Sequence, residues 1–143
     1  MYVRLENDAV AEFPYFVGKL KQDNPNTSFP ASIPEATLNS YGVYTVTEID
    51  RPTHDPMTQE VTQNNPVVVD GVWTQSWSVN QRSTDIASEN IRRERNKRLA
   101  DTDHYALSDT PAMTTEMSTY RQALRDVPSQ SGFPFNVTWP EKP

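Results

Sequence analysis

The sequence predicts an α+β protein, in which a small β-rich N-terminal unit with long proline loops precedes a C-terminal helical hairpin and an extended aromatic tail. Aromatic and β-branched residues alternate with polar ones in short runs of the first half. Residues 84–101 contain neither glycine nor proline and are rich in helix formers. Prolines concentrate at 14–66 and 111–143, where turns or extended chain must replace helix. We therefore predict two units, at 1–82 and 83–143.

The N-terminal unit is predicted to begin with two strands. Residues 2–6 alternate apolar and polar side chains, and residues 9–13 return as the second strand. Residues 16–22 could form one short helical turn. The segment 23–34 is predicted to be a loop, because its three prolines block both helix and sheet. The longest run of β-forming residues is 41–49, YGVYTVTEI, and we predict one strand over that whole range.

A β-hairpin is predicted after this strand. Residues 66–70 and 72–79 are both strand-like, and the Asp-Gly pair at 70–71 is a strong hairpin signal. Trp73 and Trp77 fall on one face of the second strand because they are four residues apart. We expect this face to lie in the core rather than to form a platform for a ligand.

Two helices are predicted in the C-terminal unit, packed as an antiparallel pair. The first spans 84–101, and either Ser83 or Thr84 can cap it. The second spans about 114–127, with Thr114 as its cap and Pro128 as its stop, while Pro111 ends the connection. The first helix has only a thin apolar stripe: Ile86, Ile91, Leu99 and Ala100. The second has a full helical face: Met113, Met117, Tyr120, Leu124 and Val127.

The tail, residues 129–143, is unusual for a chain terminus because it carries three aromatic residues and three prolines. We expect Phe133, Phe135 and Trp139 to fold back onto the helical hairpin. The alternative is that the tail, or the helix face around Tyr120, docks on another protein, since aromatic residues and arginine commonly dominate interfaces.

Composition narrows the classes of function. The 143 residues include no cysteine, so neither disulfides nor thiolate chemistry are available. No apolar run reaches the roughly 20 residues of a membrane span, and the first residues do not resemble a signal peptide. The net charge of −6 argues against general nucleic-acid binding. The basic run at 92–98 is interrupted by Glu94 and has no interleaved aromatic residues, so we expect a solvated helix face or one that pairs with carboxylates.

Catalytic and metal-binding residues are scarce. The two histidines are His54, beside Asp55 in a proline loop, and His104, which follows two aspartates at 101 and 103. Adjacent residues such as His54 and Asp55 rarely face each other productively, and the 101–104 segment is better explained as a polar helix end than as a metal site. The four glycines form no phosphate-binding loop. We predict no enzyme activity, no catalytic residue, no metal and no cofactor.

The C-terminal third carries a specific series of short motifs. They are Arg95-Asn96 with Leu99-Ala100, Thr102-Asp103 with Tyr105, Leu107-x-Asp109, Tyr120-Arg121-x-x-Leu124-Arg125-Asp126-Val127-Pro128, Phe133-Pro134 and Trp139-Pro140. In this combination, residues of about 91–143 resemble the tail assembly chaperone family of bacteriophages, and more distantly the tail fibre assembly proteins. Members of that family often have tryptophan where this chain has His104-Tyr105, and Tyr105 keeps an aromatic side chain there.

The resemblance implies a small phage protein that binds a tail-fibre or baseplate polypeptide and assists tail or fibre assembly without catalysis. A trimer is one option for the state of that partner. It would act in the host cytoplasm during assembly. The alternative is a permanent structural adaptor retained in the virion tail, at the baseplate or as a fibre connector. Neither nucleic acid nor membrane is expected as a partner. The residues expected to contact the partner are Arg92, Arg95, Tyr105, Tyr120, Arg121, Arg125, Phe133, Phe135 and Trp139.

Overall fold

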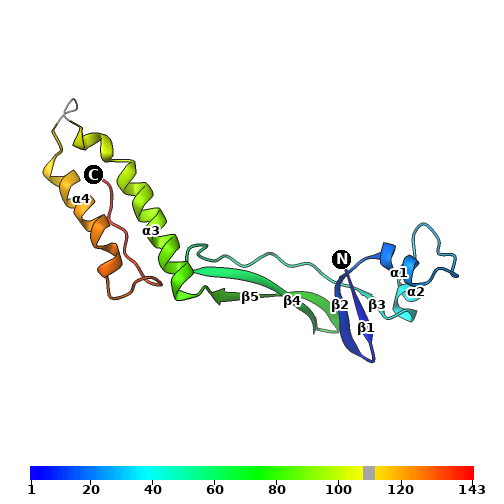
Figure 1. Ribbon diagram of the computed structural model, residues 1–143. Coiled ribbons are helices and arrows are strands. Elements are labelled where there is room, and N and C mark those ends of the chain that lie inside the picture. Colours follow the sequence, from blue (N-terminus) through cyan, green and yellow to red (C-terminus); the bar gives the residue numbers. More distant parts are fainter. Residues whose placement is uncertain (108–111) are drawn as a thin grey trace. The chain divides into compact units, whose positions relative to one another are not determined.

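The computed structural model describes residues 1–107 and 112–143, which form two compact units (Figure 1). The first unit contains residues 1–53 and 61–79, and the second contains 54–60 and 80–143. The sequence predicts one boundary, at 82/83, whereas the structure has it at 79/80 and also groups the short 54–60 segment with the second unit. The mixture of strands and helices confirms the α+β class. The elements are β1 (Tyr2–Glu6), β2 (Ala9–Tyr15), α1 (Val17–Asp23), α2 (Glu35–Ser40), β3 (Val43–Thr45), β4 (Gln59–Val69), β5 (Val72–Gln81), α3 (Thr84–Ala100), η1 (Asp103–Ala106), α4 (Thr115–Asp126) and η2 (Val127–Ser129).

The first unit is built on a three-stranded antiparallel sheet in the order β2-β1-β3. Strands β1 and β2 and helix α1 lie where the sequence predicts them. The turn into β3 requires glycine, because Gly42 has a φ of +71° and an added Cβ would lie 2.7 Å from the Leu5 carbonyl oxygen. The core of this unit consists of Tyr15, Leu20, Leu38 and Val43, with Phe29 and Ile33 of the proline-rich loop packed against it.

The prediction of one long strand over 41–49 is wrong. Strand β3 is only three residues long, and helix α2, which the sequence analysis did not predict, precedes it. After β3 the chain changes pairing partner: the Val46 N–H donates to the Met1 carbonyl, and Thr47 forms an isolated parallel bridge with Thr74 of β5. The β-forming side chains of this run therefore serve two different sheets, which strand propensity alone does not reveal.

Tyr15 is the largest fully buried side chain of the first unit. Its hydroxyl donates a 3.0 Å hydrogen bond to Asp23 Oδ2, and the guanidinium of Arg4 also bonds to that carboxylate. Burial, followed by the hydrogen bond to Asp23, raises the pKa of Tyr15 from 10.0 to about 12. The folded chain therefore retains the phenolic proton at a pH at which the unfolded chain loses it.

This raised pKa predicts an alkaline loss of stability. Because the folded-state pKa lies above the unfolded value, the contribution is complete below pH 10.0 and declines as the pH rises to about 12. A shift of this size corresponds to roughly 2 to 3 kcal/mol. In urea denaturation at pH 9 and pH 11.5, the wild type should lose more free energy of unfolding than Tyr15→Phe, which cannot ionise. An equal alkaline loss in both proteins would contradict the assignment.

The predicted hairpin is present as β4 and β5, a separate two-stranded sheet. Asp70 and Gly71 form its turn with positive φ values, as expected for an Asp-Gly pair, and β4 begins seven residues earlier than predicted, at Gln59. Trp73 and Trp77 are only half-buried, so the expectation that they form a core is wrong. The buried residue between them is Gln75, whose side-chain oxygen accepts a hydrogen bond from the Ile49 N–H. The tip of the hairpin exposes Val67, Val68, Val69 and Val72.

The second unit contains the two predicted helices, which lie side by side and antiparallel (Figure 1). Ser83 caps α3 and Thr114 caps α4, each accepting a hydrogen bond from the backbone N–H three residues later. Of the thin stripe on α3, Ile91 is buried, Leu99 is half-buried, and Ile86 and Ala100 are exposed.

The predicted apolar face of α4 forms the core between the helices. Met117, Tyr120 and Leu124 are buried together, and Leu99, Met113 and Trp139 pack against them. The tail thus reaches the helix pair through Trp139. Two positions named in the sequence analysis, Asp109 and Pro111, lie outside the described residues.

Candidate functional site

Arg121 is buried within the second unit and makes hydrogen bonds there. The residue is 7% exposed, and its guanidinium donates to the Leu99 carbonyl at 3.0 Å, to Thr102 Oγ1 at 2.5 Å and to Asp103 Oδ1 at 2.8 Å. It therefore ties the end of α3 to α4. Tyr120 beside it is also buried, so both side chains are occupied within the unit.

Two arginines of the basic run hold the aromatic tail. The Arg92 guanidinium carbon lies 5.2 Å from the centre of the Phe133 ring, and that of Arg98 lies 4.2 Å from the Trp139 ring. Such cation–π contacts contribute about 0.5 to 2 kcal/mol each, more where water is excluded. Arg98 also donates to Glu94 at 2.8 Å. These contacts occupy Arg92, Phe133 and Trp139 on their own unit.

Replacing Trp139 by alanine should therefore loosen the tail. Its ring is half-buried against the α4 core and beneath Arg98, so we expect a loss of about 2 kcal/mol in the free energy of unfolding. Phe135→Ala is the control, because Phe135 is 36% exposed and should cost well under half as much. Hydrogen exchange of the α3 and α4 amides measures the effect in this unit. Equal protection in wild type and Trp139→Ala would show that the tail adds nothing to stability.

The other four predicted residues differ in accessibility. Arg125 is exposed at the end of α4, and Phe135 is exposed in the tail. Arg95 is half-buried, with its Nε donating to Asn96 Oδ1 at 2.7 Å. Tyr105 is half-buried, and its ring centre lies 4.1 Å from that of His104. Of the predicted set, Arg92, Arg125 and Phe135 are exposed, and Arg92 also lies over the Phe133 ring.

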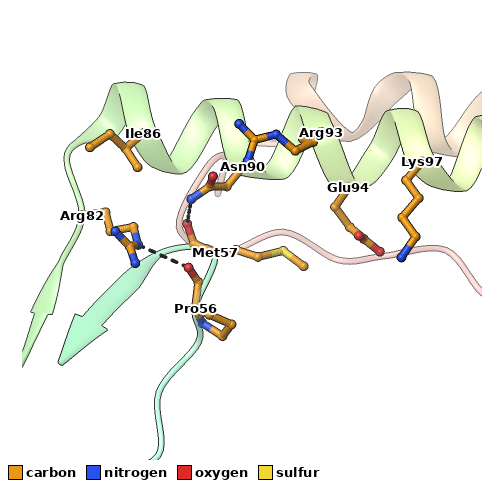
Figure 2. A pocket seen from close by; sticks show the side chains of 8 residues that line it. All are labelled: Pro56, Met57, Arg82, Ile86, Asn90, Arg93, Glu94 and Lys97. Atoms are coloured by element: carbon orange, nitrogen blue, oxygen red, sulfur yellow. Dashed lines mark hydrogen bonds between the residues drawn. The ribbon is translucent and has the colours of Figure 1, made fainter.

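A groove of about 430 Å³ lies along α3, formed entirely by residues of the second unit (Figure 2). One wall is the exposed side of α3, and the other is the short 56–57 segment together with Arg82. We call it the α3 groove. It is lined by Pro56, Met57, Arg82, Ile86, Asn90, Arg93, Glu94 and Lys97.

Hydrogen bonds hold the two walls together. Asn90 Nδ2 on α3 donates to the Met57 carbonyl at 2.9 Å, and Arg82 Nε donates to the Pro56 carbonyl at 3.2 Å (Figure 2). The 55–58 turn is braced by Asp55, which accepts from the Met57 N–H and from the Thr58 hydroxyl. The groove is therefore a formed feature of the fold.

The α3 groove combines positive charge with apolar surface. Arg82, Arg93 and Lys97 supply three cations, and Glu94 supplies one carboxylate, which already bonds to Arg98. Ile86 is 48% exposed. Such a surface can recognise a carboxylate and an apolar side chain together.

Sequence reasoning did not find this groove. It singled out the arginines of 92–98 but not Arg82, Met57 or Asn90, and it placed Ile86 in the apolar stripe. The 56–57 segment and α3 are about thirty residues apart in sequence, so only the folded chain brings them together. The one available signal was an isoleucine at the start of a helix whose apolar stripe is thin.

Other kinds of site receive no support from the described residues. Among residues 1–107 and 112–143, no three histidine or acidic side chains are grouped so that they could hold a metal ion. In the same part of the chain, no helix has the length and apolar character needed to cross a membrane. His54 lies half-buried beside the Asp55 turn, and His104 lies against Tyr105.

Comparison with known proteins gives a match that lies in the C-terminal part of the chain. Neither the search of curated proteins nor that of solved structures gave a match. Residues 88–143 match the family model described as phage tail assembly chaperone protein. The matched range starts within α3 and includes α4 and the aromatic tail. The resemblance predicted for about residues 91–143 is thus confirmed: this C-terminal part of the chain is similar to the phage tail assembly chaperone family.

Proposed function

We propose that this chain binds a tail-fibre or baseplate polypeptide of its phage and assists tail or fibre assembly without catalysis. The observation that carries the proposal is the family match over residues 88–143, which suggests a role in tail assembly. That range coincides with a helix pair whose apolar core is closed by its own tail. The binding surface must therefore be sought on the outside of this pair.

The outer surface has the chemistry of a protein-binding module. Arg125 and Phe135 are exposed, and the α3 groove adds further cations and the exposed Ile86. Arginines and aromatic rings are frequent anchors at protein interfaces. Acting as a chaperone, the chain would cover apolar surface of its client while guanidinium groups pair with client carboxylates.

A second candidate function is that of a permanent adaptor in the virion tail. It is favoured by the hairpin tip, where Val67, Val68, Val69 and Val72 are each about half exposed. Val67 and Val69 lie on one face of β4 and Val68 on the other, and exposed apolar side chains gathered in this way are frequently covered in a stable assembly. Both functions involve binding to a tail polypeptide, and they differ in whether the chain leaves.

Affinity capture and particle analysis test these proposals. The tagged full chain is co-expressed with each tail-fibre and baseplate polypeptide of its phage, and the captured proteins are identified. We expect one of them to be retained in fixed proportion, and capture of none would contradict the proposal. Mass spectrometry of purified particles then separates the two functions: a chaperone acting in the host cytoplasm is absent, and an adaptor is present in stoichiometric copies.

A further inference from the structure

We propose that the α3 groove binds an acidic segment of the client polypeptide in which an apolar side chain lies a few residues from two carboxylates. This inference rests on the proposed function and adds the site and the chemistry of the segment that the site recognises.

The charge of the groove is opposite to that of the chain. Its eight lining residues carry three cations and one carboxylate, a net charge of +2, whereas the whole chain has a net charge of −6. Glu60 and Glu89, which pair with Arg82 and Arg93, lie outside this lining. A local reversal of sign attracts acidic partners and disfavours basic ones. The chain's overall negative charge makes a polypeptide carboxylate a better occupant than the continuous phosphates of a nucleic acid.

Two of the three groove cations, Arg93 and Lys97, are available to a ligand, whereas Arg82 pairs with Glu60 at 3.3 Å. Arg93 pairs with Glu89 at 2.8 Å, but both side chains are about 70% exposed, and such surface pairs contribute little and exchange readily. Within the described residues, Lys97 has no ion-pair partner. The one carboxylate in the groove, Glu94, is engaged by Arg98 and so leaves Arg93 and Lys97 for an incoming group.

The spacing of these groups along α3 indicates how far apart the two carboxylates and the apolar side chain of the ligand lie. Arg93 and Lys97 are four residues apart on one helix, so their Cβ atoms lie about 6 Å apart, and both side chains are exposed and can turn toward one ligand. Carboxylates of residues i and i+2 in an extended peptide are about 6.6 Å apart and match this spacing. Ile86 lies two turns earlier, about 10 Å along the axis. The matching apolar residue is then three or four positions from the nearer carboxylate.

The first test uses the captured client. Arg93→Glu/Lys97→Glu should reduce capture of the tail polypeptide at least about tenfold, as expected when two ion pairs become repulsive. The matched control is Lys21→Glu/Lys142→Glu, which changes the net charge equally at exposed positions outside the groove and should capture like the wild type. The neutral variant Arg93→Gln/Lys97→Gln, checked by circular dichroism, repeats the test without introducing repulsion. Undiminished capture by both groove variants overturns the inference and leaves the proposed function in place.

The second test is independent of the client. The probe is a fluorescent peptide, GSLSSDSDSSG, compared with GSLSSKSKSSG and with a thymidine oligonucleotide. The wild type should bind the aspartate peptide in preference to both others, and Arg93→Glu/Lys97→Glu should lose that preference. If the wild type captures no tail polypeptide, the proposed function fails, while this peptide comparison still decides the chemistry of the groove. Equal binding of the two peptides, or tighter binding of the oligonucleotide, overturns the inference.

Discussion

Leu124→Ala is expected to lower the free energy of unfolding by about 3 kcal/mol. The Leu124 side chain is completely buried, and it shares the core of the second unit with Met117 and Tyr120. Removing it loses the transfer free energy of the side chain and leaves a cavity that the helix pair can only partly fill. The apolar stripe of α3 is thin, so few other contacts can compensate. Chemical denaturation of the full chain, with hydrogen exchange of the α3 and α4 amides to locate the change, measures the loss.

Ser118→Ala on the same helix is the control for this experiment. Ser118 is exposed, so its replacement should change stability by no more than about 0.5 kcal/mol. If Leu124→Ala also fell within that limit, the α4 face would not be the core of the second unit.

Arg121→Met is expected to lower the free energy of unfolding by about 2 to 4 kcal/mol, because it removes a buried guanidinium that donates several hydrogen bonds. Methionine keeps much of the volume but donates no hydrogen bond to the Leu99 carbonyl, Thr102 or Asp103. Because Thr102 is fully buried, water cannot freely replace the hydrogen bond that its hydroxyl accepts from Arg121. Thermal melting, together with exchange of the amides at the end of α3, reads the effect.

Two further variants identify which of these bonds matter. Asp103→Asn should cost less than about 1 kcal/mol, since the Asp103 side chain is 65% exposed and its pair with Arg121 is open to water. Arg121→Lys keeps the charge but lacks the guanidinium fork, so it should lie between wild type and Arg121→Met. Wild-type stability in Arg121→Met would mean that this arginine is free to serve a partner instead.

Much of the fold could be predicted from local patterns. The Asp70-Gly71 turn, the Ser83 and Thr114 caps and the apolar face of α4 follow from short-range rules of backbone geometry and periodicity. The prediction failed at 41–49, where the strand propensity is high but the pairing is divided between two sheets. It also missed α2, whose six residues bury only Leu38 and give little periodic signal.

The candidate site was less predictable because it depends on which charges the fold leaves free. From the sequence, the arginines of the basic run are equivalent. The structure distinguishes them: Arg92 and Arg98 contact tail aromatics, whereas Arg93 lines the α3 groove. The burial of Arg121 likewise follows from the packing of α4 against the end of α3. Which arginines are engaged within the fold depends on long-range contacts, and no single sequence motif encodes these contacts.

The most direct test of the central claim is a titration of folding yield. The candidate tail polypeptide is synthesised with increasing amounts of this chain, and the soluble, assembled product is measured. A protein that acts by binding should raise the yield in proportion to its amount, with saturation near a fixed stoichiometric ratio in the complex. A full yield from a small fraction of that amount, or no change in yield at any ratio, would contradict the account.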